Sequence, residues 1–148
     1  MLHRFDPRLD ADAVPGWVAG QREHGTIGAF GLSNFPAAAL PLFIGKLVLS
    51  AHQIELSAAA SQALDDGTHA ASRAAGAEVQ AWSPLDGGAL LADDDRGRAL
   101  DAIAGDFGLD RAGLLLRWVA VAARGVVRPP PADAWYAVWQ AARGRPVP

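Results

Sequence analysis

Residues 26–54, TIGAFGLSNFPAAALPLFIGKLVLSAHQI, hold two runs of strand type with a short helical run between them. The strand-type runs cover residues 26–33 and 47–54. The helical run covers residues 36–43 and starts at Pro36, which suits the first turn of a helix. This β-α-β order indicates two parallel strands joined by a crossover connection.

The same alternation continues toward the carboxyl end. We expect a helix over residues 63–75, a strand over 78–83, helices over 96–107 and 110–123, a strand stub over 125–128 and an amphipathic helix over 132–142. Strands separated by helices form a parallel sheet, and the carboxyl ends of its strands are the usual binding edge. The fold class is therefore α/β.

Local signals support the later helices. The acidic run at residues 93–95 is typical of a solvated helix start favoured by the helix dipole, and Asp110 is the expected N-cap of the next helix. Trp135, Tyr136 and Trp139 follow at helical spacing, which predicts a packing face, or an exposed adhesive patch if no neighbour covers it.

Length and composition exclude several classes of protein. The chain has 148 residues, whereas a complete eight-stranded α/β barrel needs about 250. Hydrophobic residues make up 51% and charged residues 20%, so the chain can form a core. It has no cysteine, which rules out disulfides and thiolate metal sites, and its four histidines lack metal-ligand spacing. We expect no metal site.

Charge and hydropathy argue against nucleic acid and membrane partners. The net charge is −3, and only one basic residue is a lysine, so the sequence offers no basic stripe for a phosphate backbone. Lys46 and Arg117 interrupt the most apolar runs before they reach the roughly 18 residues of a membrane span. The first residues, MLHRFD, are unlike a signal peptide, so we expect a cytoplasmic protein.

Polar and aromatic side chains gather where the expected strands end. They are Ser33, Asn34, Gln53, Glu55, Trp82 and Ser83. Such residues at one sheet edge favour a small-molecule cleft. Each also has a plain structural interpretation: Ser33 and Asn34 as a turn and helix cap, Gln53 as a strand-end polar residue, and Trp82 as a core residue.

Several segments occur in a recognisable order: GTIGAFGLSNF at 25–35, HQIELS at 52–57, LDDGT at 64–68 and AWSPLDGG at 81–88. With residues 1–10 before them and 133–148 after them, they resemble the aldo-keto reductase family, in particular its bacterial oxidoreductase branch. The resemblance implies one domain over residues 1–148. That domain would be part of a TIM (β/α)8 barrel, roughly strands 4 or 5 to 8 with their helices, with residues 133–148 as the C-terminal helix and tail.

The resemblance also implies an NADP(H) site. Ser33, Asn34 and Gln53 fall where the family hydrogen-bonds the nicotinamide carboxamide, and Trp82 falls where a ring stacks on the nicotinamide. Amide and indole side chains suit these tasks, because a carboxamide needs donors and acceptors and a flat ring needs a flat partner.

Three further positions take their roles from the same resemblance. Ser83 and Leu85 fall in the loop that lines the cofactor's pyrophosphate. His3 matches the catalytic histidine that orients the substrate carbonyl. The family's substrates imply a small-molecule aldehyde or ketone, reduced by hydride transfer.

The sequence departs from the family at the catalytic acid and at the segment that binds the cofactor's 2′-phosphate. The family's tyrosine, lysine and aspartate come from its first three strands, whereas Tyr136 and Lys46 lie elsewhere in this chain. Residues 125–131 run almost directly into the last helix, with Arg128 as a lone cation, and Asp86 replaces the family's usual glycine. These departures predict weakened cofactor binding and no autonomous turnover.

Two functions therefore remain open from the sequence. One is an incomplete NADPH-dependent reductase that borrows its acid from a complementing N-terminal half. The other is a non-catalytic remnant or interaction module that associates through an open sheet, for example as a homo-oligomer.

Overall fold

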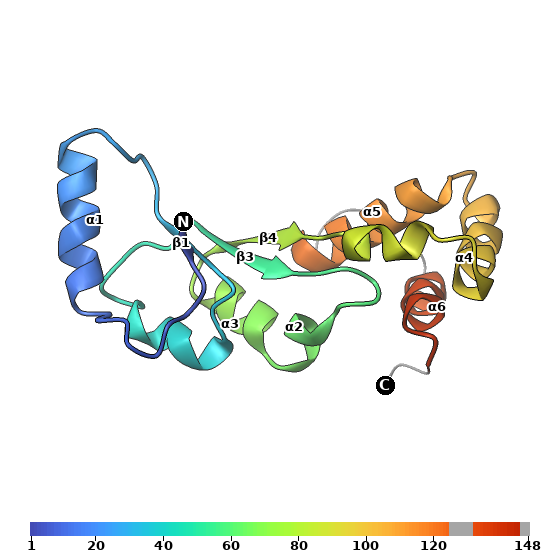
Figure 1. Ribbon diagram of the computed structural model, residues 1–148, viewed down its shortest axis with the longest axis horizontal. Coiled ribbons are helices and arrows are strands. Elements are labelled where there is room, and N and C mark those ends of the chain that lie inside the picture. Colours follow the sequence, from blue (N-terminus) through green and yellow to red (C-terminus); the bar gives the residue numbers. More distant parts are fainter. Residues whose placement is uncertain (125–131, 146–148) are drawn as a thin grey trace. The chain divides into compact units, whose positions relative to one another are not determined.

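A computed structural model describes residues 1–124 and 132–145 of the chain. It contains one four-stranded sheet in the order β1-β2-β3-β4 (Figure 1). The strands are β1 (Leu2–His3), β2 (Gly31–Ser33), β3 (Ala51–Glu55) and β4 (Glu78–Trp82). β1 pairs with β2 and β2 with β3 in parallel, which confirms the expected α/β class with a parallel sheet.

Two strands are shorter than the sequence indicates. β2 takes only the last three residues of the expected run 26–33, and β3 begins at Ala51 and not at residue 47. The later start has a local cause, because the N–H groups of Lys46 and Leu47 both turn back to the carbonyl of Phe43. The apolar, β-type composition of the two expected runs therefore extends beyond the residues that pair in the sheet.

The helices that connect the first strands are also shorter and more interrupted than expected. Pro41 lies inside η1 (Ala37–Leu42), which is a 3-10 helix. The expected helix 63–75 divides into α2 (Gln62–Asp65) and α3 (Thr68–Ala74), because Gly67 adopts a left-handed φ of 84°. α1 (Ala13–Glu23) was not expected, since its proline and glycines conceal the helical pattern.

The chain divides into two compact units. The first comprises Met1–Ile54 and Ala63–Gln80, and the second comprises Glu55–Gln62 and Ala81–Pro148. In the first unit a buried core contains Leu32, Phe35, Leu40 and Phe43. The rings of Phe35 and Phe43 meet edge to face with centroids 5.7 Å apart. This core lies next to the end of β2 and so supports the turn that comes after it.

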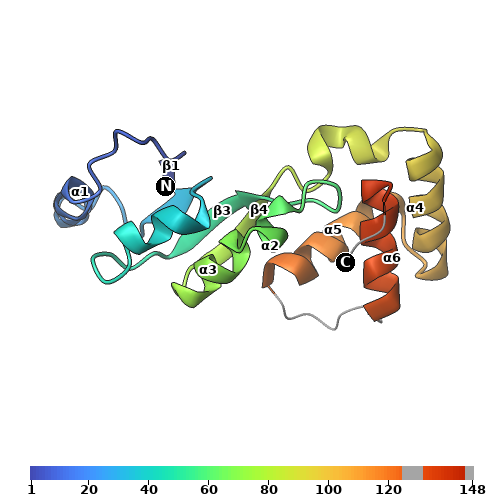
Figure 2. The same ribbon diagram turned by 90° about the horizontal axis from the view of Figure 1, so that it is seen from below.

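The second unit is largely helical. It holds η2 (Asp86–Leu91), α4 (Asp95–Asp106), α5 (Arg111–Arg124) and α6 (Ala132–Arg143), and Figure 2 shows α6 beside α4. α4, α5 and α6 agree with the expected helices within one or two residues. The short η2 was not expected, since Gly87 and Gly88 in it have positive φ.

Tryptophan side chains join the last two helices. Trp118 on α5 stacks on Trp135 of α6 with ring centroids 4.9 Å apart. Trp139 is buried, and its Nε1 donates to Ser61 Oγ at 2.8 Å. Tyr136 stays exposed. The predicted packing face is therefore formed by the tryptophans.

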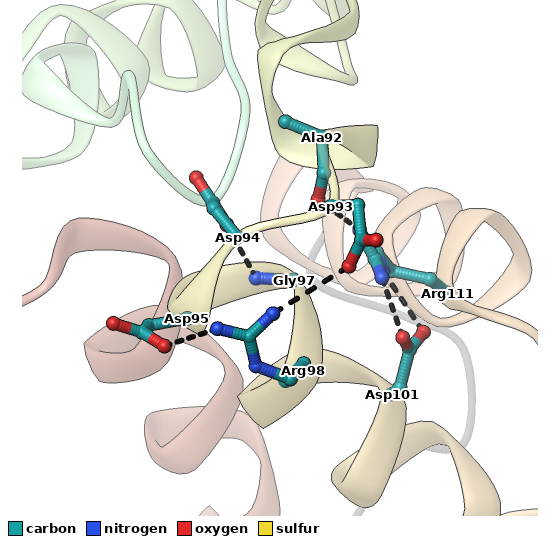
Figure 3. Close-up of polar contacts among 8 residues, drawn as sticks. All are labelled: Ala92, Asp93, Asp94, Asp95, Gly97, Arg98, Asp101 and Arg111. Atoms are coloured by element: carbon teal, nitrogen blue, oxygen red, sulfur yellow. Dashed lines mark hydrogen bonds and ion pairs between the residues drawn. The ribbon is translucent and has the colours of Figure 1, made fainter.

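A cluster of charged residues fixes the start of α4 (Figure 3). Asp94 is the N-cap, and its carboxylate accepts the Gly97 N–H at 2.8 Å, which confirms the acidic run as a helix start. The Arg111 guanidinium donates to the carboxylate of Asp101, at 2.9 Å from Nε, and to the carbonyl of Ala92 at 2.6 Å. One arginine thus links α5, α4 and the end of η2.

Some expectations fall outside the described residues. These are the strand stub at 125–128, the lone cation Arg128 and the last three residues of the tail. A single domain over residues 1–148 stays a prediction. Within the described part of the chain, no helix has the length and apolar character needed to cross a membrane.

Candidate functional site

The carboxyl ends of three neighbouring strands align in register. His3 of β1 pairs with Ser33 of β2, and Ser33 pairs with Gln53 of β3. Ser33 is buried, Gln53 is half-buried and His3 is exposed. Residues paired across a parallel sheet project to the same face, so three of the predicted site residues lie at one level of the sheet.

Asn34 occupies a left-handed turn directly after β2. Its φ is +56°, and its N–H donates to the carbonyl of Gln53 at 2.9 Å. Its side-chain Nδ2 donates to Ser33 Oγ at 3.1 Å and lies 3.4 Å from Nε2 of His3. The structure therefore brings His3, Ser33, Asn34 and Gln53 into one polar cluster, which we call the strand-end cluster.

The backbone of the strand-end cluster is unusual. Arg4 also has a positive φ, 65°, and its N–H donates to the carbonyl of Ser33 at 2.8 Å. Non-glycine residues with positive φ persist only where surrounding contacts hold them, and they concentrate at functional sites. Two such residues at adjacent strand ends mark this edge as a candidate site on grounds the sequence did not provide.

One polar residue behind the strand-end cluster was missed by sequence reasoning. His52 is fully buried and accepts the backbone N–H of Phe35 through its Nε2, at 3.3 Å. Burial lowers the pKa of this histidine. The available signal was a titratable residue inside an otherwise apolar strand run, LVLSAHQI, where a buried polar group needs partners.

The remaining predicted residues lie in the second unit. Trp82 is half-buried at the end of β4, and its carbonyl accepts the N–H of Leu56 at 3.2 Å. Ser83 has a φ of +54°, and its Oγ accepts the Gly87 N–H at 2.9 Å. The carbonyl of Leu85 accepts the N–H of Gly88 at 3.0 Å. These contacts shape residues 83–88 into a tight loop.

The loop after β4 carries a second group of strained backbone positions. Asp86 has a φ of +55° beside that of Ser83. Its N–H donates to the carbonyl of Ser83 at 2.9 Å, so its backbone closes the turn. The N–H groups of Asp86, Gly87 and Gly88 are thus all bonded within the loop, which fixes its shape.

The one tyrosine and the one lysine of the sequence lie outside the strand-end cluster. Tyr136 lies on α6 in the second unit. Lys46 lies in the turn before β3, and its ammonium contacts the carboxylate of Asp12 at 2.5 Å. That hydrogen bond lowers the pKa of Asp12. Neither residue belongs to the strand-end cluster.

Comparison with known proteins gives related sequences of one kind. No protein-family model matches the chain. Oxidoreductase YdhF of Escherichia coli is 35% identical over 96 residues, which cover 64% of this chain and 32% of the relative. The 6-dehydroglucose reductase of Agrobacterium fabrum is 29% identical over 123 residues, covering 80% and 41%. Oxidoreductase YcsN of Bacillus subtilis is 31% identical over 115 residues, covering 73% and 38%.

A solved structure gives the fold. The thermostable aldo-keto reductase Tm1743, solved with the inhibitor epalrestat, superposes with a TM-score of 0.72 at 22% identity. The match covers 94% of this chain and 52% of that structure. This likeness shows the fold of the chain, which is that of part of the aldo-keto reductases. Its sheet and helices correspond to part of their α/β barrel, which confirms the fold expected from the sequence.

The match covers only part of each relative. The chain spans between 32% and 41% of the length of these curated relatives. Their names describe whole oxidoreductases, of which this chain corresponds to a part.

Proposed function

We propose that this chain carries the nicotinamide side of an NADP(H) site and acts as one part of an oxidoreductase that reduces aldehydes or ketones. The relatives named as oxidoreductases and reductases support the reaction class. The observation that carries the proposal is the strand-end cluster, in which Ser33, Asn34 and Gln53 share one edge with His3.

The chemistry of the strand-end cluster suits an amide-bearing ring. A carboxamide offers two N–H donors and one carbonyl acceptor, and the Asn34 and Gln53 amides are complementary to both. Such a ring supplies a hydride when NADPH is bound. His3 is exposed at the same edge, where an imidazole can orient the carbonyl oxygen of a substrate.

The aldo-keto reductase family uses a tyrosine as the proton donor for the carbonyl oxygen, and in the strand-end cluster His3 would have to serve alone, which makes it a poor substitute. The sequence has one tyrosine and one lysine, and both lie outside the cluster. We therefore propose that the acid comes from a complementing segment. The 148-residue chain should not oxidise NADPH with simple aldehydes above background, and turnover that survives rigorous purification would contradict this.

Cofactor binding is the direct test. We expect titration calorimetry to show NADP⁺ binding to the full chain, and Asn34→Asp and Gln53→Glu to weaken it about tenfold or more. Each isosteric change removes N–H donors worth about 1–3 kcal/mol at a buried contact. Gln140→Glu, at an exposed position on α6, makes the same change of charge and should leave binding unchanged.

A wild-type chain that shows no affinity for NADP⁺ would refute the cofactor proposal. Equal affinity in the wild type, Asn34→Asp and Gln53→Glu would refute the assignment of these side chains. The first result would favour the interaction module.

A second candidate rests on the edges of the sheet. Within the described residues, the sheet ends at β1 on one side and at β4 on the other. Strand edges with unpaired backbone groups favour association with another chain. We propose that the chain self-associates or pairs with a complementing segment. Sedimentation velocity over rising concentration tests this, and a monomer at every concentration would contradict self-association.

A further inference from the structure

His52 lies one residue before Gln53 in β3 and is fully enclosed by the first unit. Its Nε2 accepts the Phe35 N–H at 3.3 Å, and its Nδ1 lies 2.7 Å from Oγ of Ser72 on α3. Ser72 is also fully buried. A ring with two polar nitrogens is costly to bury without partners, so these two contacts account for its place in the strand.

The partners determine where the protons lie on this ring. A backbone N–H can only donate, so the Nε2 that faces Phe35 carries no proton. The proton of the neutral ring is then on Nδ1 and points to Ser72 Oγ. The Ser72 hydroxyl in turn donates to the carbonyl of Thr68 at 2.6 Å. Each donor in the series has an acceptor, and the lowered pKa of His52 favours the same neutral form.

This ring holds the backbone that carries Asn34. Two successive N–H groups bind to β3: that of Asn34 to the Gln53 carbonyl at 2.9 Å, and that of Phe35 to the His52 ring. Asparagine tolerates a left-handed φ better than most residues, but this conformation is still less favourable for it than for glycine and is stabilised by contacts with its surroundings. Contacts at both amides provide that support, and they set the direction of the Asn34 side chain.

We propose that His52 is a positioning residue for cofactor binding. By accepting the Phe35 N–H, it keeps Asn34 in the left-handed conformation that turns its amide toward His3 and Ser33. This inference rests on the proposed function, because the ligand that benefits is the nicotinamide ring. His52 itself touches neither cofactor nor substrate in this role.

Two substitutions separate the contacts of the ring. In His52→Gln the longer side chain carries its amide oxygen to the place of Nε2 and keeps an acceptor for Phe35. In His52→Asn the shorter side chain reaches only toward Ser72 and leaves the Phe35 N–H unpaired. His24→Asn is the control, because His24 is exposed on the same unit and bonds only locally, to the carbonyl of Gly20.

The first readout needs no ligand. Nitrogen NMR of the wild type should show His52 protonated on Nδ1. Hydrogen exchange at the Phe35 amide should accelerate about tenfold or more in His52→Asn and stay near the wild-type rate in His52→Gln and His24→Asn. An unchanged exchange rate in His52→Asn would overturn the positioning role, whatever the chain binds.

The second readout compares NADP⁺ with 2′-phospho-ADP-ribose, which lacks the nicotinamide. His52→Asn should weaken NADP⁺ binding about tenfold and leave the analogue unaffected, and His52→Gln should restore NADP⁺ binding. A general loss of structure would weaken both ligands and overturn the inference. If the wild type binds neither ligand, the proposed function fails, and the exchange rates alone decide whether His52 holds the turn.

Discussion

At the scale of single residues, Gly31 shows how closely β2 approaches β3. A Cβ at this position would lie 2.5 Å from the carbonyl oxygen of Ala51, a backbone atom that cannot move aside without shifting the strand. Gly31→Ala should therefore lower the free energy of unfolding by about 1–3 kcal/mol in urea titrations. Gly28→Ala, where nothing lies within 4 Å, is the matched control. Equal stability of the two variants would show that the strands separate easily.

The sequence predicted part of the strand-end cluster. Ser33, Asn34 and Gln53 stand out because polar residues end apolar runs, and a parallel sheet gathers such ends. The sequence indicated a turn at Asn34, a residue type that tolerates a left-handed φ, but not the two hydrogen bonds to β3 that hold it, since their acceptors belong to another element. His52 was hidden for the same reason, because its partner Ser72 lies on a different element, α3.

At the scale of elements, Arg111 links the start of α5 to the middle of α4, and its effect should depend on pH. Its side-chain hydrogen bonds lower the pKa of Asp101 from the ordinary 3.8. The unfolded chain then takes up a proton at higher pH than the folded chain does. The stabilisation is complete above the ordinary pKa and is lost as the pH falls through the lowered one.

Arg111→Met should therefore reduce stability at neutral pH. Its stability should also fall less than that of the wild type as the pH is lowered toward about 3, as measured by urea midpoints at a series of pH values. Arg98→Met is the control, because Arg98 forms more exposed ion pairs with Asp93 and Asp95. If the urea midpoints of the wild type and Arg111→Met fell equally steeply as the pH is lowered, the contact between Arg111 and Asp101 would not persist in solution.

One buried hydrogen bond helps to hold α6 against the rest of the second unit. Ser61→Ala removes the acceptor of Trp139 Nε1 and leaves a buried donor without a partner. We expect a loss of about 1–3 kcal/mol in the free energy of unfolding. Ser50→Ala, the same change at an exposed serine, should have little effect. A loss no larger than that of Ser50→Ala would mean that Trp139 finds another partner.

Elements were predicted well where a repeating pattern extends over three or more turns. α4, α5 and α6 have amphipathic spacing and an acidic residue at or near their starts, so their bounds agree closely with expectation. β2 was predicted too long, because pairing with a neighbour decides where a strand begins and its own composition does not. The break at Gly67 was missed within an alanine-rich run, where one left-handed residue ends the helix.

At the scale of the whole molecule, length gave the first correct statement about the fold. A chain of 148 residues is too short for a complete barrel, and its match covers 52% of a solved aldo-keto reductase. The division into two compact units had no signal in the sequence. No proline-rich or glycine-rich linker marks it, because the boundaries after Ile54 and Gln80 fall inside β3 and β4.

Boundaries inside strands predict that the two units unfold together, as a single domain would. Independent domains are usually joined by exposed linkers, whereas here regular strands continue from one unit into the other. Four of the five tryptophans belong to the second unit, so their fluorescence reports on it, whereas far-ultraviolet circular dichroism reports on both. Gly31→Ala changes only the first unit. We expect it to lower both urea midpoints equally. If it left the fluorescence midpoint unchanged, the units would unfold separately and residues 1–148 would form two domains.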